Sequence, residues 1–264
     1  MPPDSESIAA VSAVDRLYAG LMLHASGDAN ANLGGKLLYA GELNVASSAL
    51  LIAANIAGAA SLTGTADQAM QKRAIRLGLV DFLVTTLDEA LRILKNQVRK
   101  RETVAVCVAQ PSEQVEREMV EIGVLPDLLS AAAPGNAEYK MFLSQGAQRV
   151  HPVPVPDDQN LLLWSVAADP LVWLPRLDDF ARACLSPVAV QPQRWARLAP
   201  RYLGRASQGL RLLRCSTEAA AAFVSQVRQQ VADGAINVAV EIEQENGEES
   251  VLHQFTPKGA RINQ

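Results

Sequence analysis

The 264-residue chain could form one large domain or two of ordinary size, and with 49% hydrophobic residues we expect a globular protein with a substantial core. Its net charge of -4 and scattered basic residues predict that it binds neither nucleic acid nor an anionic membrane. The sequence contains no run of 18 apolar residues and no basic leader, so we expect a cytoplasmic protein without a membrane span.

The residues that most often bind metals or form disulfides are few and scattered. Three cysteines lie far apart in apolar surroundings, which predicts buried apolar side chains rather than a disulfide framework or a zinc site. Three histidines have no second ligand within four positions, so we expect no metal site. These residues are Cys107, Cys184 and Cys215, and His24, His151 and His253.

A group of basic residues near position 95 is interpreted as the solvated face and end of a helix. It consists of Arg92, Lys95, Arg99, Lys100 and Arg101.

From residue 36 onward, short apolar runs alternate with helical patterns, which is typical of parallel β/α units. The expected strands are residues 36–40, 59–62, 80–84, 103–109 and 125–130. The expected helices are residues 11–23, 47–58, 66–79, 86–101 and 111–123, with Thr85 or Thr86 as the N-cap of the fourth. We therefore predict an α/β fold with a Rossmann-like, doubly wound parallel sheet.

Composition changes near residue 150, where prolines stand at alternate positions in the segment RVHPVPVPDDQN. Proline has no backbone N–H and is excluded from central strands, so this segment is interpreted as a boundary or an edge connection. We predict a Rossmann-like domain at residues 1–150 and a C-terminal α+β region at residues 151–264, whose role the sequence does not assign.

The C-terminal region is expected to end in a β-hairpin. Alternating apolar residues precede the dipeptide Asn246-Gly247, which favours the tight turn that matches strand twist. The hairpin offers an edge strand, a weak indication of a homodimer. The other expected elements are a helix that begins after Asp169 or Pro175, a basic helix at 193–202, a strand near 209–215, and a helix capped by Ser216 or Thr217.

Four segments occur in the order and spacing of a known domain. They are ANLGGKLLYAG, IAGAASL, RLGLVDFLVTTLDEALRILKNQVRK and VEREMVEIGVLPDLLS, within residues 31–130. Over about residues 32–130 the chain resembles the NAD-binding domain of urocanase, urocanate hydratase. The resemblance implies a Rossmann-like fold, a tightly held NAD+ that acts as an electrophile, the addition of water to urocanate, and a homodimer.

The resemblance places the family's glycine-rich phosphate turn on residues 43–47, whose sequence LNVAS contains no glycine. Glycines in such a turn let the backbone approach the diphosphate closely. We therefore expect the side chain of Leu43 to lie where a diphosphate would pass. The family's acidic ribose ligand falls on Gly64 or Thr65, and its Gln-Thr-Ser-Ala-His segment falls on residues 131–135, which read AAAPG.

The turn nevertheless keeps groups that could contact a ligand. The candidate cofactor-binding residues are Gly41, Glu42, Asn44, Ser47, Ser48 and Thr65. A helix that starts near Ser47 would direct free N–H groups at a single carboxylate or phosphate. Each polar residue is equally explained as a turn or cap residue. No catalytic residue is assigned, because neither Cys184 nor Cys215 has a histidine nearby in the sequence.

Three functions follow from these observations. NAD is implied by the resemblance, whereas the turn without glycine predicts that NAD is not held. A small-molecule binding module or a scaffold, that is a pseudoenzyme, is therefore favoured over an active hydratase. An NAD-dependent lyase of the urocanase type is the alternative.

Overall fold

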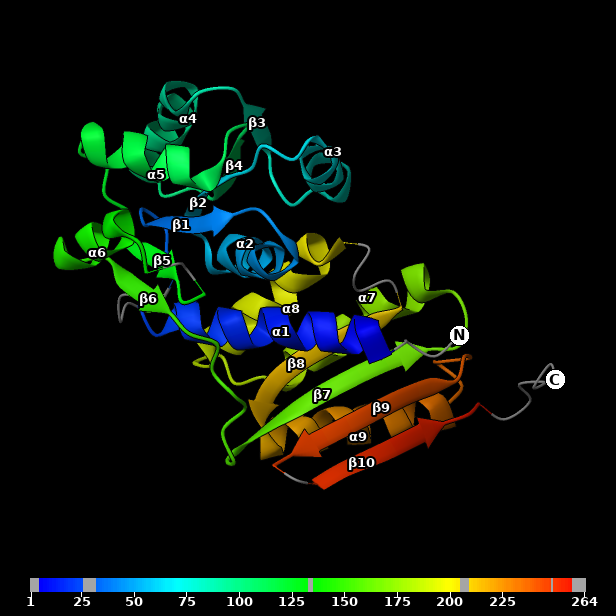
Figure 1. Ribbon diagram of the computed structural model, residues 1–264. Coiled ribbons are helices and arrows are strands. Elements are labelled where there is room, and N and C mark those ends of the chain that lie inside the picture. Colours follow the sequence, from blue (N-terminus) through cyan, green and yellow to red (C-terminus); the bar gives the residue numbers. More distant parts are fainter. Residues whose placement is uncertain (1–4, 26–31, 133–134, 205–208, 248, 258–264) are drawn as a thin grey trace. The chain divides into compact units, whose positions relative to one another are not determined.

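The computed structural model describes residues 5–25, 32–132, 135–204, 209–247 and 249–257 (Figure 1). The chain divides into two compact units, Ala13–Val153 and a second unit that combines Met1–Ser12 with Pro154–Gln264. Helix α1 (Ser5–Met22) contributes residues to both units. Each unit has its own sheet, and the two units are described separately below.

The first unit is built on a six-stranded sheet with the order β3-β4-β2-β1-β5-β6. Every neighbouring pair of strands is parallel. The strands are β1 (Leu37–Glu42), β2 (Ala60–Gly64), β3 (Phe82–Val84), β4 (Val104–Val108), β5 (Leu128–Ser130) and β6 (Gln148–Val150). This order confirms the predicted Rossmann-like, doubly wound sheet. Strands β2, β4 and β3 lie on one side of β1, and β5 and β6 lie on the other.

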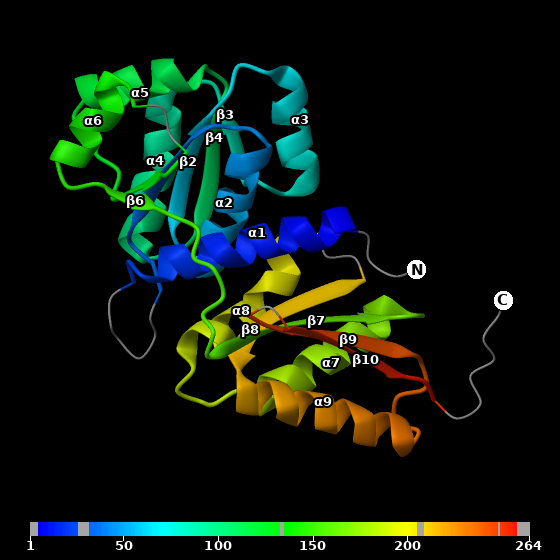
Figure 2. The same ribbon diagram turned by 60° about the horizontal axis from the view of Figure 1, so that its bottom comes forward.

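Helices cover both faces of this sheet (Figure 2). They are α2 (Val45–Ala57), α3 (Gln68–Leu77), α4 (Leu87–Lys100), α5 (Ser112–Glu121) and α6 (Ala137–Ser144). The last three lie on one face, where Leu62, Val106, Leu91, Met119 and Phe142 belong to a single buried cluster. Helices α2 and α3 lie on the opposite face. Because both faces are covered, β4 can be apolar along its whole length, as its sequence predicted.

The ends of α4 follow from its capping residues. Thr86, one of the two predicted N-caps, forms a capping box with Glu89. At the other end Arg101 is the C-cap in a left-handed conformation, with φ +59°. Glycine usually takes such a position, since a side chain there is strained.

The second unit contains a four-stranded antiparallel sheet with the order β10-β9-β7-β8. Trp164 of β7 packs on Phe223 of α9, with ring centroids 5.0 Å apart, so helices cover one face of this sheet. Its elements are β7 (Gln159–Val166), α7 (Pro170–Cys184), α8 (Val190–Tyr202), β8 (Leu210–Ser216), α9 (Thr217–Ala232), β9 (Val240–Asn246) and β10 (Glu249–Phe255).

The hairpin of β9 and β10 confirms the predicted turn at Asn246-Gly247. Helix α7 begins directly after Asp169 rather than after Pro175. The N-cap of α9 is Ser216 rather than Thr217. No helix in the described part of the chain is long and apolar enough to cross a membrane.

Candidate functional site

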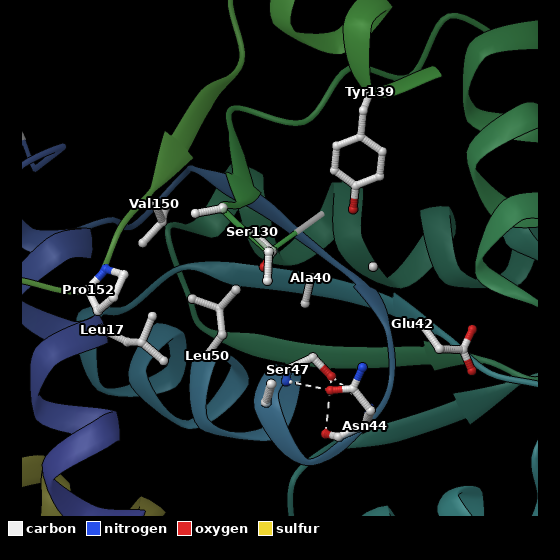
Figure 3. A pocket seen from close by; sticks show the side chains of 14 residues that line it. Leu17, Ala40, Glu42, Asn44, Ser47, Leu50, Ser130, Tyr139, Val150 and Pro152 are labelled. Carbon is white, nitrogen blue, oxygen red and sulfur yellow. Dashed lines mark hydrogen bonds between the residues drawn. The ribbon is translucent and has the colours of Figure 1, made fainter. Parts of the chain in front are cut away.

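A pocket of about 260 Å³ lies at the carboxyl ends of β1 and β5. Strand order reverses between these two strands, and open α/β sheets bind their ligands at such a switch point. The end of β1 and the first turn of α2 form one side of the pocket, and Ser130 and Tyr139 form another (Figure 3). Leu17, Leu50 and Val150 contribute apolar walls.

The pocket brings together four of the six predicted residues: Gly41, Glu42, Asn44 and Ser47. Ser48 is half-buried beside them, and its hydroxyl donates to the carbonyl of Asn44 over 2.6 Å. Thr65 is fully buried, and its hydroxyl accepts the N–H of Asp67 over 3.2 Å. Neither of these two lines the pocket. In the segment 131–135, residues 133 and 134 lie outside the described residues.

The first turn of α2 is closed by its own side chains. Asn44 Oδ1 accepts the N–H of Ser47 over 3.0 Å, and Ser47 Oγ accepts the N–H of Asn44 over 2.8 Å. This capping box uses backbone donors that a phosphate-binding turn would direct at its ligand. Among the described residues, the N–H groups of Val45 and Ala46 remain without a protein acceptor.

Glu42 places a fixed negative charge at the rim of the pocket. Its Oε2 accepts the N–H of Ser112, the first residue of α5, over 3.1 Å. Pro111, the N-cap residue of α5, supplies no side-chain hydrogen bond, so the carboxylate caps this helix from a neighbouring strand. A carboxylate at a helix N-terminus is stabilised by the helix dipole. Glu42 therefore combines two roles, as a cap of α5 and as a carboxylate in the wall of the pocket.

The side chain of Leu43 does not block the pocket. It is 1% exposed, packs in the interior of the unit, and is not part of the pocket wall. The expectation that it would lie in the path of a diphosphate is therefore wrong. Its N–H donates to the carbonyl of Gly64, the last residue of β2, over 2.9 Å.

Gly41 is required at the end of β1 for two reasons. Its φ is +77°, a conformation that residues with a side chain rarely adopt. A Cβ atom at this position would also lie 2.9 Å from the hydroxyl oxygen of Tyr139. The hydroxyl of Tyr139 thus lies close to Gly41, and Figure 3 shows its ring directed toward the end of β1.

A buried polar cluster that the sequence did not reveal lies behind the pocket. Tyr39 Oη is 3.2 Å from the carbonyl oxygen of Ser112 and 3.1 Å from Glu116 Oε1, and Asn136 Nδ2 donates to Glu116 Oε2 over 2.6 Å. Glu116 is 1% exposed. Its place in the helical apolar pattern 112, 115, 116 and 119 could have marked it as a buried acid.

Burial dominates the electrostatics of this cluster. Tyr39 has a single hydroxyl hydrogen and two acceptors within reach, the carbonyl of Ser112 and Oε1 of Glu116. Burial raises the pKa of the Glu116 carboxyl, against the hydrogen bonds from Asn136 and Tyr39 that lower it. Burial, followed by the neighbouring Glu116, also raises the pKa of Tyr39 and Tyr139, so both remain phenols.

The hydroxyl of Tyr139 is the unsatisfied member of this region. The residue is 0% exposed, and its oxygen has no hydrogen-bond partner among the described residues. Its ring packs against Tyr39 and Phe142, with centroids 6.0 and 6.1 Å away. A buried hydroxyl without a partner costs about 1–3 kcal/mol, so an acceptor in the pocket would stabilise the site.

The cysteines lack the environment of nucleophiles. Burial raises the pKa of Cys107 and Cys215 to about 12, and it also raises that of Cys184. All three are therefore thiols rather than thiolates near neutral pH. In the described part of the chain, no three His, Cys, Asp or Glu side chains gather in an arrangement that could hold a metal ion.

A doubly wound parallel sheet with a pocket at its switch point defines a protein of the Rossmann-like class. The family model for the urocanase Rossmann-like domain matches residues 14–149, which is just over half of the 264-residue chain. The chain therefore belongs to the urocanase family, as the four colinear segments predicted. In this family the matched domain binds NAD.

Proposed function

We propose that this protein is not an active urocanate hydratase but binds a small polar molecule without a diphosphate in the pocket between β1 and β5. The observation that carries the proposal is the carboxylate of Glu42 beside the N-terminus of α5, where it accepts the N–H of Ser112 over 3.1 Å. The same carboxylate lines the pocket beside the first turn of α2, on which the resemblance to urocanase places the phosphate turn.

The charges around the pocket support the same conclusion. Its described wall contains no Arg, Lys or His, and Glu42 contributes a negative charge. A diphosphate in this position would approach a carboxylate without a compensating cation, which is unfavourable in a partly desolvated site. The capping box of Asn44 and Ser47 removes further donors. The residues present therefore do not fit NAD in its usual place.

Size also argues for a small ligand. The volume of about 260 Å³ lies below the range of about 300–1,000 Å³ that is typical of pockets for drug-sized molecules. The available partners are an acceptor, the carboxylate of Glu42, and donors from Tyr139 and Ala46. We infer a ligand that carries an N–H donor, such as an amine or amide, together with an acceptor group.

Mass spectrometry of molecules released from the denatured, purified protein tests this proposal. We expect a small nitrogen-containing molecule, or an apo protein that amines and amides stabilise against heat. Millimolar NAD+ is expected to leave the melting temperature unchanged. A ligand that does bind would, at about 100 times its Kd, raise the free energy of unfolding by roughly 2.7 kcal/mol. Release of NAD, or a shift of several degrees on its addition, would establish the alternative of an NAD-dependent lyase.

A matched pair of variants locates the ligand. Glu42→Gln and Tyr139→Phe each remove one proposed ligand partner, and each is expected to weaken binding by about tenfold or more. Glu121→Gln changes the net charge as Glu42→Gln does but lies at the exposed end of α5, so it should bind normally. Equal affinities in all three variants would place the ligand elsewhere.

A scaffold role is supported by the edge of the second sheet. Strand β10 is at the edge, where Val251 and Leu252 are 49% and 58% exposed. Unpaired edge strands favour association between chains. A homodimer through β10 therefore stays a prediction, to be checked by light scattering on the protein and on a Leu252→Lys variant.

A further inference from the structure

A second pocket, of about 310 Å³, lies at the opposite edge of the parallel sheet, near the amino ends of its strands. Its wall combines the residue that precedes β1, the end of α4, and the loop that contains Gly34 and Gly35. The positively charged residues in this wall are Lys36, Arg99 and Arg101, with His24 beside them.

These cations come from separate parts of the chain. Lys36 precedes β1, whereas Arg99 and Arg101 belong to the end of α4, so the fold itself brings them together. No acidic side chain is part of the described wall. Asp127 contacts this wall, since its carboxylate binds Lys36 over 3.0 Å. Glu102 follows Arg101 in the chain but does not line the pocket.

The arginines are not engaged by carboxylates. Among the described residues, Arg99 contacts Asn96 over 3.4 Å and forms no ion pair, and Arg101 has no side-chain hydrogen bond or ion pair. Arg92, on the same helix, does pair with Asp88. Arg99 and Arg101 are exposed at the end of α4, in agreement with the predicted solvated helix face and end. They also line a concave wall.

Arg101 lies beside the loop that contains Gly34 and Gly35. A Cβ atom on Gly34 would lie 2.8 Å from the Arg101 carbonyl oxygen, so the two backbones touch. A Cβ atom on Gly35 would lie 3.7 Å from both Cγ and Nε of Arg101, which shows that the arginine side chain runs along this loop. Arg101 is exposed, and its side chain lines the pocket beside this loop.

The favourable interaction of a basic residue with the dipole of α4 does not explain why an arginine occupies position 101. Basic residues in the last turn of a helix are favourable, and Lys100 already supplies this interaction. Arg101 instead adopts φ +59°, a conformation that favours glycine. An arginine at such a strained position is consistent with a role for the side chain itself.

We propose that this second pocket binds a small phosphate-bearing anion through Arg99, Arg101 and Lys36. Guanidinium groups match the geometry of phosphate oxygens with paired hydrogen bonds, and an ammonium adds a point charge. The concave shape and limited volume favour a phosphorylated metabolite over a nucleic acid, which needs an extended basic surface. This site is independent of the function proposed for the first pocket.

The test is a calorimetric titration of the full-length protein with inorganic pyrophosphate at low ionic strength. We expect saturable binding that weakens as salt is added. Citrate and a single-stranded oligonucleotide serve as comparison anions, and both are expected to bind more weakly than pyrophosphate. Tighter binding of citrate would assign carboxylate chemistry, and tighter binding of the oligonucleotide would assign a nucleic-acid surface, so either result would overturn the proposal.

The variant Arg101→Gly distinguishes an effect on anion binding from an effect on stability. Because glycine accepts the left-handed backbone without strain, this variant should melt at the same temperature as the parent protein or higher. Its affinity for pyrophosphate should nevertheless fall by about tenfold or more, the cost of one charge-assisted hydrogen bond. Arg99→Gln is expected to act in the same direction.

Lys100→Gln is the matched control, since it removes the same charge from the same helix end but does not line the pocket. Its affinity should change by less than about twofold, as expected for a screened surface charge. If Lys100→Gln weakened binding as much as Arg101→Gly, the loss of affinity would come from the lower net positive charge of this region. The proposed site would then be wrong. Absence of saturable binding up to roughly 10 mM pyrophosphate would also refute it.

Discussion

Glu42, the last residue of β1, accepts a hydrogen bond from the backbone N–H of Ser112, the first residue of α5, over 3.1 Å. The two residues are 70 positions apart in the chain. The contact joins two β/α units at the sheet edge where this fold binds ligands. It places a carboxylate at that edge of the sheet in this member of the urocanase family.

We expect this contact to stabilise α5 as an N-cap does. Glu42→Ala removes both the acceptor and the charge and should lower the free energy of unfolding by about 1 kcal/mol. Glu42→Gln keeps an acceptor and should cost about half as much or less. Urea unfolding followed by circular dichroism measures both values. If the two variants were equally stable, or if neither differed from the parent, the capping role of Glu42 would be wrong.

The regular elements of the first unit follow from local sequence, because each strand is an apolar run and each helix has its own caps. The sequence predicted the strand at 103–109 and the helix at 86–101 with the right type and nearly the right ends, observed as β4 and α4. Three elements were not predicted: α6, β6 and β7. The first two are 8 and 3 residues long, too short for periodicity to indicate. Strand β7 directly follows the proline-rich segment, and its apolar run was not recognised because that segment was interpreted as a boundary or an edge connection.

The candidate site was predictable only in part. Gly41, Glu42, Asn44 and Ser47 lie together because they are neighbours in one turn, which the strand and helix patterns located. The cluster of Tyr39, Glu116 and Tyr139 depends on contacts between distant segments and on side-chain burial. The same limit explains the wrong expectation for Leu43, because the burial of its side chain depends on the tertiary structure around it.

Glu116 should make stability depend on pH. Its folded-state pKa is raised, so the folded protein keeps a proton that the unfolded chain releases above about pH 4.3. Stability is therefore greatest below the unfolded pKa and falls as the pH rises through the folded pKa. Glu116→Gln imitates the protonated acid and should remove this fall, so it should be more stable than the parent at about pH 8 and similar at about pH 4.

Thermal unfolding across this pH range, with Glu121→Gln as an exposed control on the same helix, measures the effect of Glu116. The control should keep the pH dependence of the parent protein. A parent and a Glu116→Gln variant with parallel stability curves would mean that Glu116 is ionised in the folded state.

The two neighbouring tyrosines should respond differently to loss of their hydroxyl groups. Tyr39→Phe leaves the carbonyl of Ser112 and the carboxyl of Glu116 without their shared partner, which should cost about 1–3 kcal/mol. Tyr139→Phe removes a hydroxyl that has no described partner, so the change should be within about 0.5 kcal/mol or stabilising. Chemical unfolding of both variants gives the comparison. A larger loss for Tyr139→Phe than for Tyr39→Phe would reveal a hydrogen bond to the Tyr139 hydroxyl.

The approach of Tyr139 to Gly41 can be measured as a coupling energy. Gly41→Ala should be destabilising because φ is +77° and because the new Cβ would lie 2.9 Å from the tyrosine oxygen. Gly78→Ala has a similar φ of +67° but no atom within 4 Å of the new Cβ, so it measures the backbone cost alone, about 1–2 kcal/mol.

Gly41→Ala should exceed this backbone cost, and the excess should shrink when Tyr139→Phe removes the oxygen that the Cβ meets. A double-mutant cycle is expected to give a coupling of about 0.5–1.5 kcal/mol between the two positions. If Gly41→Ala cost no more than Gly78→Ala, or if Tyr139→Phe gave no relief, the tyrosine would not lie against β1 and could not serve as a wall of the pocket.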